Sequence, residues 1–298
     1  STHGSIQAIA DFDLESIREG PRFVNPQAFS NTVINAPASR LAILFDATGV
    51  NSTIATGSAS ALDALGSAVS MLRAGRAGAL LCGAALGRSE EILSGFGKAG
   101  RLARSPEGSV PFGAGREGAA LSEGAGVFLL EDEARALARG TRPQAHIAGV
   151  CSAFETGVGG LFRSMRGAIA EAGLSPEDIS AVIAFASGSR EGDLEEGEAI
   201  GKVFAARAAG NRIAIPVTAP KSMTGDCLEA SGAIGVALAV LAIEQGKIPP
   251  IARLDEVDRV FSRLDLVRGK FREAAVRHVL VNARDESGHC ASVVISKP

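Results

Sequence analysis

The stretch that most constrains this chain runs over residues 50–75, V-N-S-T-I-A-T-G-S-A-S-A-L-D-A-L-G-S-A-V-S-M-L-R-A-G. Its pattern predicts a short buried strand at 53–55, a tight corner at 56–58 and a helix over 59–73. Such a corner presents one side chain at its apex, Ser58, in front of the free N–H groups of the helix N-terminus. The apolar residues of the predicted helix recur at steps of three and four: Leu62, Leu65, Val69 and Leu72.

Ser58 has two interpretations at this point. A hydroxyl in front of a helix N-terminus is well placed to attack a carbonyl carbon, because the N–H groups stabilise the charge that develops. A serine in that place also caps a helix, which is the simpler interpretation of this stretch alone.

The composition excludes several classes of partner. The 298 residues, 46% of them hydrophobic, suffice for a large buried core in one domain or in two intimately packed halves. The formal charge is −3 and the chain has no run of lysine or arginine, so nucleic acid is not expected as a partner. No apolar stretch approaches the length of a membrane span without a charge or a glycine, so no membrane is expected either.

Cysteine and histidine give no sign of a metal site. The four cysteines are widely spaced without a C-x-x-C pattern, and the four histidines lack metal-ligand spacing. We therefore expect a reducing compartment, the cytoplasm, and no bound metal.

Strands alternate with helices along the chain, which predicts an α/β fold class. The second half repeats the first in outline. Strands are expected at 78–83, 123–131, 145–153, 181–186, 213–217, 277–282 and 290–296. Helices are expected at 13–20, 26–44, 132–139, 159–172, 193–208 and 228–245, and 89–115 is expected to be rich in loops.

Four segments, in the family's order, resemble motifs of the beta-ketoacyl synthases, the condensing enzymes of the thiolase fold. Residues 56–61 are similar to T-A-C-x-S-G, which places the family's nucleophilic cysteine at Ser58. The other segments are N-P-Q-A-F at 25–29, the run from P-F to G-A-G at 111–126, and K-S-M-T-G at 221–225. The resemblance covers essentially all 298 residues.

This resemblance implies a thiolase-like five-layered α-β-α-β-α architecture of two similar halves, 1–144 and 145–298. The first half carries the nucleophile corner but is incomplete, because the chain opens at Ser1, where the family has reached the end of its second strand. A sheet that lacks a central strand leaves backbone groups unpaired. We therefore expect the missing segment on a separate chain or cleavage product, unless it was lost.

The departures from the family concern its reacting groups. Besides Ser58 for cysteine, Phe185 and Asp226 stand at the positions of the two catalytic histidines. The glycine- and phenylalanine-rich gating loop has become N-A-R-D-E-S-G-H-C at 282–290, whereas Lys221 is kept.

Condensation on this fold needs a thiolate, two imidazole N–H donors for the malonyl thioester oxygen, and two backbone N–H groups for the oxyanion. The hydroxyl of Ser58 is far less acidic than a thiol and needs a base. Asp226 is a weak base for serine, and its charge would repel the enolate that forms on decarboxylation. We therefore expect no condensing activity from this chain by itself.

The substituted residues have structural interpretations. Phe185 is expected to fill the vacated imidazole volume, and Lys221 to form a buried ion pair with Asp226. Cys227 is expected to be a core thiol. Asp193 and Glu196 suit the start of a helix. A solvated or interface loop is expected for the three charged residues Arg284, Asp285 and Glu286.

The leading hypothesis is a degenerate ketosynthase subunit that resembles the chain-length factor of type II polyketide synthases. The resemblance implies an active ketosynthase as heterodimer partner, and acyl groups delivered on the phosphopantetheine of an acyl carrier protein, with no cofactor of the chain's own. The alternative is an acyltransferase or thioesterase with Ser58 as nucleophile and Asp226, or a partner's histidine, as base. A third hypothesis is a pure assembly protein whose cavity is closed.

Overall fold

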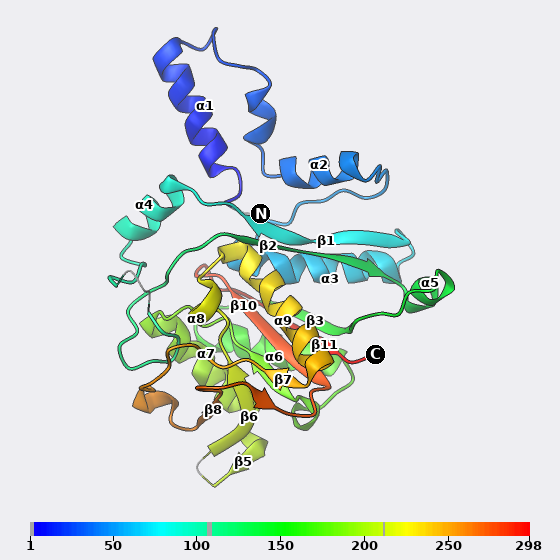
Figure 1. The fold of residues 1–298 in the computed structure, drawn as a ribbon, viewed down its shortest axis with the longest axis vertical. Coiled ribbons are helices and arrows are strands. Elements are labelled where there is room, and N and C mark those ends of the chain that lie inside the picture. The colour runs from blue at the N-terminus through cyan, green and yellow to red at the C-terminus, as the bar shows by residue number, and fades with distance from the viewer. Residues whose placement is uncertain (1–2, 106–108, 211) are drawn as a thin grey trace.

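Two β-sheets enclose a pair of helices in the computed structural model, which describes residues 3–105, 109–210 and 212–298 (Figure 1). The smaller sheet pairs β1 (Ala79–Leu86) with β2 (Gly124–Glu131) in antiparallel register. In the larger sheet, seven strands lie in the order β3-β11-β10-β4-β6-β5, with β8 beside β6. Its strands are β3 (His146–Phe154), β4 (Ala181–Ile183), β5 (Ala208–Ala209), β6 (Arg212–Thr218), β8 (Leu264–Leu266), β10 (His278–Arg284) and β11 (His289–Ser296).

The helices complete the layers. Between the sheets, α3 (Ser60–Arg73) and α9 (Ser231–Gln245) contact each other and both sheets. The outer face of the larger sheet is covered by α6 (Val158–Glu171) and α7 (Arg190–Val203), and α2 (Ala36–Leu44) lies over the smaller sheet (Figure 1). The order is α-β-α-β-α, so the predicted thiolase-like architecture is confirmed.

The remaining elements are short helices, turns and one strand pair, only some of which lie at the periphery. One helix, α1, projects beyond the smaller sheet at the top of Figure 1. These elements are α1 (Ile6–Glu19), α4 (Glu90–Lys98), α5 (Glu133–Ala138), α8 (Lys221–Thr224), the antiparallel pair β7 (Lys247–Ile248) and β9 (Arg272–Glu273), and the 3-10 turns η1 (Ala28–Asn31), η2 (Gly57–Ala59), η3 (Pro176–Asp178), η4 (Ala205–Arg207), η5 (Leu228–Ala230) and η6 (Arg259–Phe261).

Apolar runs form the centre of the larger sheet because both of its faces are covered by helices. In β10 the residues Val279 to Ala283 are all buried, and in β11 every residue after His289 is buried. The stretch Leu228–Gln245 is the one described helix long and apolar enough to span a membrane. More than half of it is buried and it packs on α3, β2 and β10, so it forms the core of the molecule.

A repeat relates the two halves. Each half has a 3-10 turn, a central helix and an antiparallel strand pair: η2, α3 and β1–β2 in the first, η5, α9 and the β10–β11 hairpin in the second. In the second half the hairpin has a strand on either side, β4 parallel to β10 and β3 antiparallel to β11. Within the described residues, no strand flanks β1 or β2 in this way.

The structure corrects several predictions. Residues 53–55 are not a strand, because no described strand lies beside them to complete a ladder. The predicted buried strand in β1 is only partly buried, and its Leu81 is 43% exposed, since the outer face of the small sheet is partly open. The expected loop at 89–115 contains α4, whose N-cap Ser89 accepts a hydrogen bond from the Ile92 N–H; residues 106–108 lie outside the described ranges.

Candidate functional site

The corner around Ser58 forms as predicted, but Ser58 does not cap the helix. Gly57 has φ of +61°, a conformation that residues with a Cβ rarely adopt. The Ser60 hydroxyl donates to the Gly57 carbonyl at 2.6 Å and accepts from the Thr56 N–H at 3.0 Å, so Ser60 holds the corner together. Ser58 is 7% exposed, and its hydroxyl makes no hydrogen bond to a base within the described ranges.

A carboxylate from the second half occupies the space in front of this corner. The Ser58 N–H donates to Oδ2 of Asp285 at 3.2 Å. A Cβ added to Gly57 would lie 1.9 Å from the same oxygen, so the carboxylate packs directly against the glycine. Burial raises the pKa of Asp285, but hydrogen bonds from Ser287 and from the Ser58 N–H outweigh it and hold the pKa below its ordinary value. Asp285 is therefore not the solvated residue that the sequence predicted.

A second buried charge lies beside the corner on η5. Glu229 is fully buried, and its carboxylate accepts hydrogen bonds from the His3 backbone N–H at 2.8 Å and from His3 Nδ1 at 3.0 Å. The hydrogen bond to Glu229 raises the pKa of His3 despite its burial, and the charge of Asp285 raises it further. Burial raises the pKa of Glu229, but the hydrogen bonds from His3 bring it below its ordinary value. Sequence reasoning missed this pair, although a glutamate at the start of an apolar helix was a signal.

The residues at the two histidine positions form one buried cluster. The Lys221 ammonium lies 3.0 Å from Oδ2 of Asp226 and 3.1 Å from the centre of the Phe185 ring. The contact between Lys221 and Asp226 is an ion pair without the alignment of a hydrogen bond, and the side chains of both residues are 6% exposed. The other oxygen of Asp226 accepts from the Leu228 N–H at 2.9 Å and from the Ser231 hydroxyl at 3.1 Å. The predicted buried ion pair is confirmed.

Burial lowers the pKa of Lys221, although the nearby carboxylates, Asp226 foremost, oppose this. Phe185 is half-buried and contributes a ring face to the ammonium, so it does more than fill volume. The structure thus brings Lys221, Asp226 and Phe185 together, while no hydrogen bond among the described residues connects them to Ser58.

The sequence suggested that Asp193 and Glu196 cap their helix, but in the structure they do not. The N-cap of α7 is Ser189, which accepts from the Gly192 N–H at 3.1 Å. The Glu196 carboxylate instead accepts from the N–H groups of Phe185 and the next residue at 2.9 and 2.8 Å. Asp193 accepts from the Phe112 N–H at 2.9 Å, and burial raises its pKa to about 7. Both carboxylates hold the loop that positions Phe185.

Cys227 is a core thiol, as predicted. It is 1% exposed, and its Sγ lies 3.0 Å from the Ser122 hydroxyl. Burial raises its pKa above the ordinary value, which makes a reactive thiolate unfavourable.

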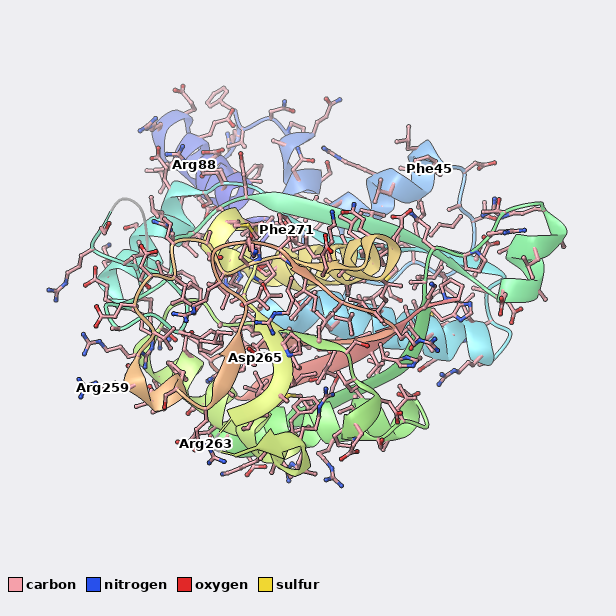
Figure 2. All side chains as sticks on the ribbon, turned by 60° about the horizontal axis from the view of Figure 1, so that its bottom comes forward. Phe45, Arg88, Arg259, Arg263, Asp265 and Phe271 are labelled. Carbon is pink, nitrogen blue, oxygen red and sulfur yellow. The ribbon has the colours of Figure 1, made fainter. Side chains whose placement is uncertain are left out.

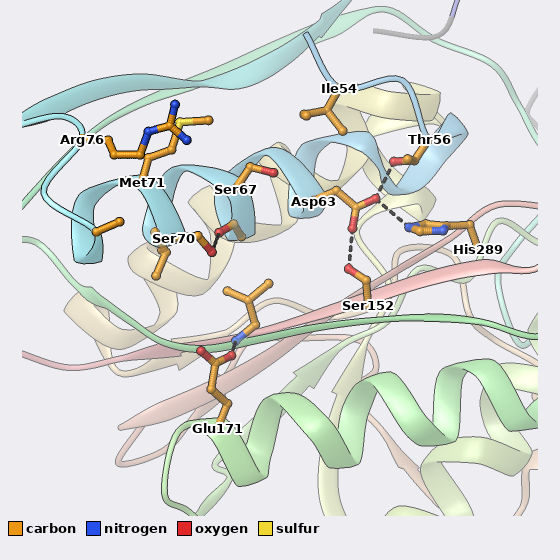
Figure 3. Close-up of a pocket in the computed structure, with 14 residues that line it drawn as sticks. Ile54, Thr56, Asp63, Ser67, Ser70, Met71, Arg76, Ser152, Glu171 and His289 are labelled. Atoms are coloured by element: carbon orange, nitrogen blue, oxygen red, sulfur yellow. Dashed lines mark hydrogen bonds and ion pairs between the residues drawn. The ribbon is translucent and has the colours of Figure 1, made fainter. Parts of the chain in front are cut away.

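A cavity of about 680 Å³ lies along α3, with both apolar and polar side chains in its lining (Figure 3). Its central feature is the Asp63 carboxylate, which accepts hydrogen bonds from Thr56 and Ser152 and lies 2.7 Å from His289 Nε2. A second cavity, of about 420 Å³, lies between residues 49–54 and the free edge of β1. Ser58 lines neither cavity.

The described residues offer no group of three histidine, cysteine or acidic side chains that could hold a metal ion. The titratable groups near Ser58 already have partners: His3 contacts Glu229, and Asp285 accepts from the Ser58 N–H of the corner. Such an arrangement stabilises fixed charge, and it provides no base for the Ser58 hydroxyl. At the histidine positions neither Phe185 nor Asp226 supplies a donor in place of imidazole, and the nearby Lys221 ammonium is paired with Asp226.

The layers and the corner in front of α3 define a condensing-enzyme scaffold of the thiolase type. Residues 4–136 match the beta-ketoacyl synthase N-terminal domain and residues 149–255 its C-terminal domain. The chain therefore belongs to the beta-ketoacyl synthase family.

Its relatives include proteins of polyketide and fatty-acid synthesis. A Streptomyces coelicolor protein whose name assigns it as a polyketide beta-ketoacyl synthase 2 is 34% identical over 93% of this chain and 66% of its own length. A second protein of that organism, named as an actinorhodin polyketide beta-ketoacyl synthase 2, is 32% identical over 94% of this chain and 69% of its own. The 3-oxoacyl-[acyl-carrier-protein] synthase 2 of Vibrio harveyi is 29% identical over 94% of this chain and 70% of its own length. The chain thus spans about two thirds of the length of these relatives.

Solved structures agree with the fold over the whole chain. The ishigamide ketosynthase/chain length factor superposes with a TM-score of 0.92 and 28% identity, covering 100% of this chain and 74% of the other. A type II polyketide synthase acyl-carrier protein in complex with its ketosynthase bound to the hexaketide also superposes with a TM-score of 0.92, at 25% identity, covering 100% of this chain and 76% of the other.

Proposed function

We propose that this chain is a non-condensing ketosynthase-like subunit that pairs with an active ketosynthase in polyketide or fatty-acid biosynthesis and contributes wall to the acyl cavity. The observation that carries the proposal is the cluster of Lys221, Asp226 and Phe185 at the two histidine positions. In this cluster the ammonium faces a carboxylate on one side and an aromatic ring on the other.

This cluster opposes malonyl decarboxylation. Phe185 has no donor, and the Asp226 carboxylate only accepts hydrogen bonds, so neither residue replaces an imidazole N–H. The nearby Lys221 ammonium is paired with Asp226 and lies against the Phe185 ring, and an enolate oxygen there would meet the negative charge of Asp226. Loss of one oxyanion donor costs about a hundredfold or more in rate, and here two imidazole donors are replaced. A subunit of this kind acts through its surface and not through its own chemistry.

The relatives support the kinds of partner. One similar structure is a ketosynthase/chain length factor, and another contains an acyl-carrier protein with its ketosynthase. We infer that this chain completes a heterodimer in the cytoplasm, and that a carrier protein's phosphopantetheine delivers the acyl group, with no cofactor of the chain's own.

The repeat of the two halves supports a further part of the assembly. The β10–β11 hairpin has neighbouring strands on both edges, whereas the described residues give the β1–β2 pair none. A groove of about 420 Å³ follows the free edge of β1. We infer that N-terminal ketosynthase strands complete this sheet, supplied by a separate chain or by another segment of the same protein.

The alternative with Ser58 as a nucleophile finds no support in the contacts described above. No hydrogen bond among the described residues joins its hydroxyl to Asp226 or to a histidine, and Asp285 takes its N–H. Acyl transfer by serine needs a base within hydrogen-bond reach.

Native mass spectrometry of the protein purified from its own host, followed by activity assays, tests the proposal. We expect a co-purifying ketosynthase that carries the cysteine and both histidines, no malonyl-carrier decarboxylation by this chain alone, and full condensation by the pair with Ser58→Ala. Efficient decarboxylation by the isolated chain would refute the proposal. Loss of turnover with Ser58→Ala would instead favour acyl transfer at Ser58.

A further inference from the structure

The turn between β10 and β11 reaches across to the corner of the first half. Within the turn, Oδ1 of Asp285 accepts from the Ser287 N–H at 3.0 Å, which fixes the side chain. The other oxygen, Oδ2, accepts from the Ser58 N–H at 3.2 Å and packs on Gly57. One carboxylate thus joins two segments 227 residues apart in the sequence.

We propose that Asp285 is a built-in occupant of the Ser58 corner, whose carboxylate fills the place where an acyl carbonyl oxygen would bind, so that the 285–288 turn keeps this corner closed. A backbone N–H in front of a helix N-terminus is the usual donor to such an oxygen. Here the chain's own acceptor already uses it.

A further contact holds the turn in place. His289, directly after the turn, lies 2.7 Å from Asp63 on α3, which also binds Thr56 of the corner segment (Figure 3). The ion pair of Glu286 with Arg101 is exposed on both sides and contributes little to this attachment. The turn is therefore attached to the first half through Asp285 and through His289.

The surrounding charges compensate the half-buried carboxylate. The hydrogen bond to Glu229 raises the pKa of His3, which favours its protonated form, and the charges of His3 and Asp285 interact. On its other side, Asp285 faces the N-terminus of α3, where helix N–H groups carry partial positive charge. Negative and positive groups therefore alternate from Glu229 through His3 and Asp285 to the helix, which keeps the closed arrangement favourable.

A closed corner excludes acyl chemistry at residue 58 in this chain without any partner. An oxyanion at the same N–H would lie beside a carboxylate, and two negative charges at that distance repel. The inference goes beyond the proposed pairing, because it concerns the isolated chain.

A cysteine placed at residue 58 reports on this occupancy. We would measure alkylation of Ser58→Cys by iodoacetamide as a function of pH, site by site with mass spectrometry, in the full chain. A neighbouring carboxylate raises a thiol pKa by about one unit, so adding Asp285→Ala should lower that pKa and speed the reaction about tenfold near neutral pH. The matched control is Glu286→Ala, in the same turn, which should leave the rate unchanged, and the native Cys151 serves as an internal standard.

Asp285→Asn separates charge from volume. It should lower the thiol pKa as Asp285→Ala does, while only Asp285→Ala should also raise the limiting rate of the thiolate. Equal pKa values and equal limiting rates for Ser58→Cys with and without Asp285 would overturn the proposal.

Hydrogen exchange of the Ser58 amide is a measurement that needs no variant. The amide should be protected from exchange, and fast exchange in the native chain would equally overturn the proposal. Neither failure bears on the proposed pairing, which rests on the cluster around Lys221.

Discussion

Lys221 has its ammonium 3.0 Å from the Asp226 carboxylate, in a site where both side chains are almost fully buried. Removal of one partner from such a pair leaves an uncompensated buried charge, which costs far more than the pair itself contributes. The residues on which the proposed function rests are therefore also positions where a single substitution strongly destabilises the protein.

We expect Lys221→Met to lower the free energy of unfolding by about 3–5 kcal/mol, because the Asp226 carboxylate loses its counter-charge. The double variant Lys221→Met with Asp226→Leu should recover much of the loss. Urea unfolding measures both. Arg73→Met, in the exposed pair with Glu171, is the control and should cost about 1 kcal/mol or less; an equal loss in the two single variants would contradict the buried-charge explanation.

Asp193 gives a pH dependence of known sign. Burial raises its pKa from 3.8 to about 7, so in this range the folded chain keeps a proton that the unfolded chain has released. Its contribution to the free energy of unfolding therefore falls as pH rises from about 4 to 7. Asp193→Asn should remove this slope, measured by urea unfolding across the range; an unchanged slope would show that Asp193 is already ionised at low pH.

At the scale of elements, the sequence predicts features that depend on neighbouring residues, but it does not predict contacts between distant segments. The periodicity of Leu62 and Leu65 predicted α3, and the buried runs predicted β10 and β11, since these signals depend on neighbours in the sequence. The Asp285 contact joins residues 227 apart and the His3 contact residues 226 apart, and no local pattern encodes either. The Lys221–Asp226 pair was predictable because both lie in one motif.

Close approach between elements occurs where glycine faces a helix. A Cβ on Gly149 of β3 would lie 2.2 Å from the Ala168 carbonyl oxygen of α6, whereas one on the exposed Gly95 of α4 would meet nothing within 4 Å. We expect Gly149→Ala to destabilise the protein by about 1–3 kcal/mol through overpacking. Gly95→Ala should instead stabilise it, by up to about 1 kcal/mol, because alanine favours a helix. Thermal unfolding distinguishes them, and a stable Gly149→Ala variant would show that β3 and α6 can separate.

At the scale of the whole molecule, large apolar side chains gather on the exposed end of α2 and the residue after it. Ile43, Leu44 and Phe45 are 82%, 72% and 61% exposed, and Phe45 lies at the outer side of Figure 2. Contiguous exposed apolar surface of this kind marks an interaction site. On the proposed function, this surface contacts the ketosynthase partner.

We expect Phe45→Asp with Ile43→Asp to weaken pairing with that ketosynthase by about thirtyfold, since apolar anchors carry much of the energy of an interface. The melting temperature should change little, because both side chains are exposed. Native mass spectrometry at several protein concentrations measures the pairing. Phe271→Asp, at an exposed residue away from α2 in Figure 2, is the control; if it weakens pairing as much, the interface lies elsewhere.

On the proposed function, the contact of Asp285 with the Ser58 N–H would also make condensing chemistry hard to restore. A cysteine restored at 58 alone would lie beside a carboxylate that disfavours its thiolate, so this reversion would bring little gain. Removal of Asp285 alone would open the corner around a serine that still lacks a base. Neither change is rewarded without the other, and both histidine positions would still have to be restored. Such epistasis would act as a ratchet in evolution, and it lengthens the list of changes needed to re-engineer the activity.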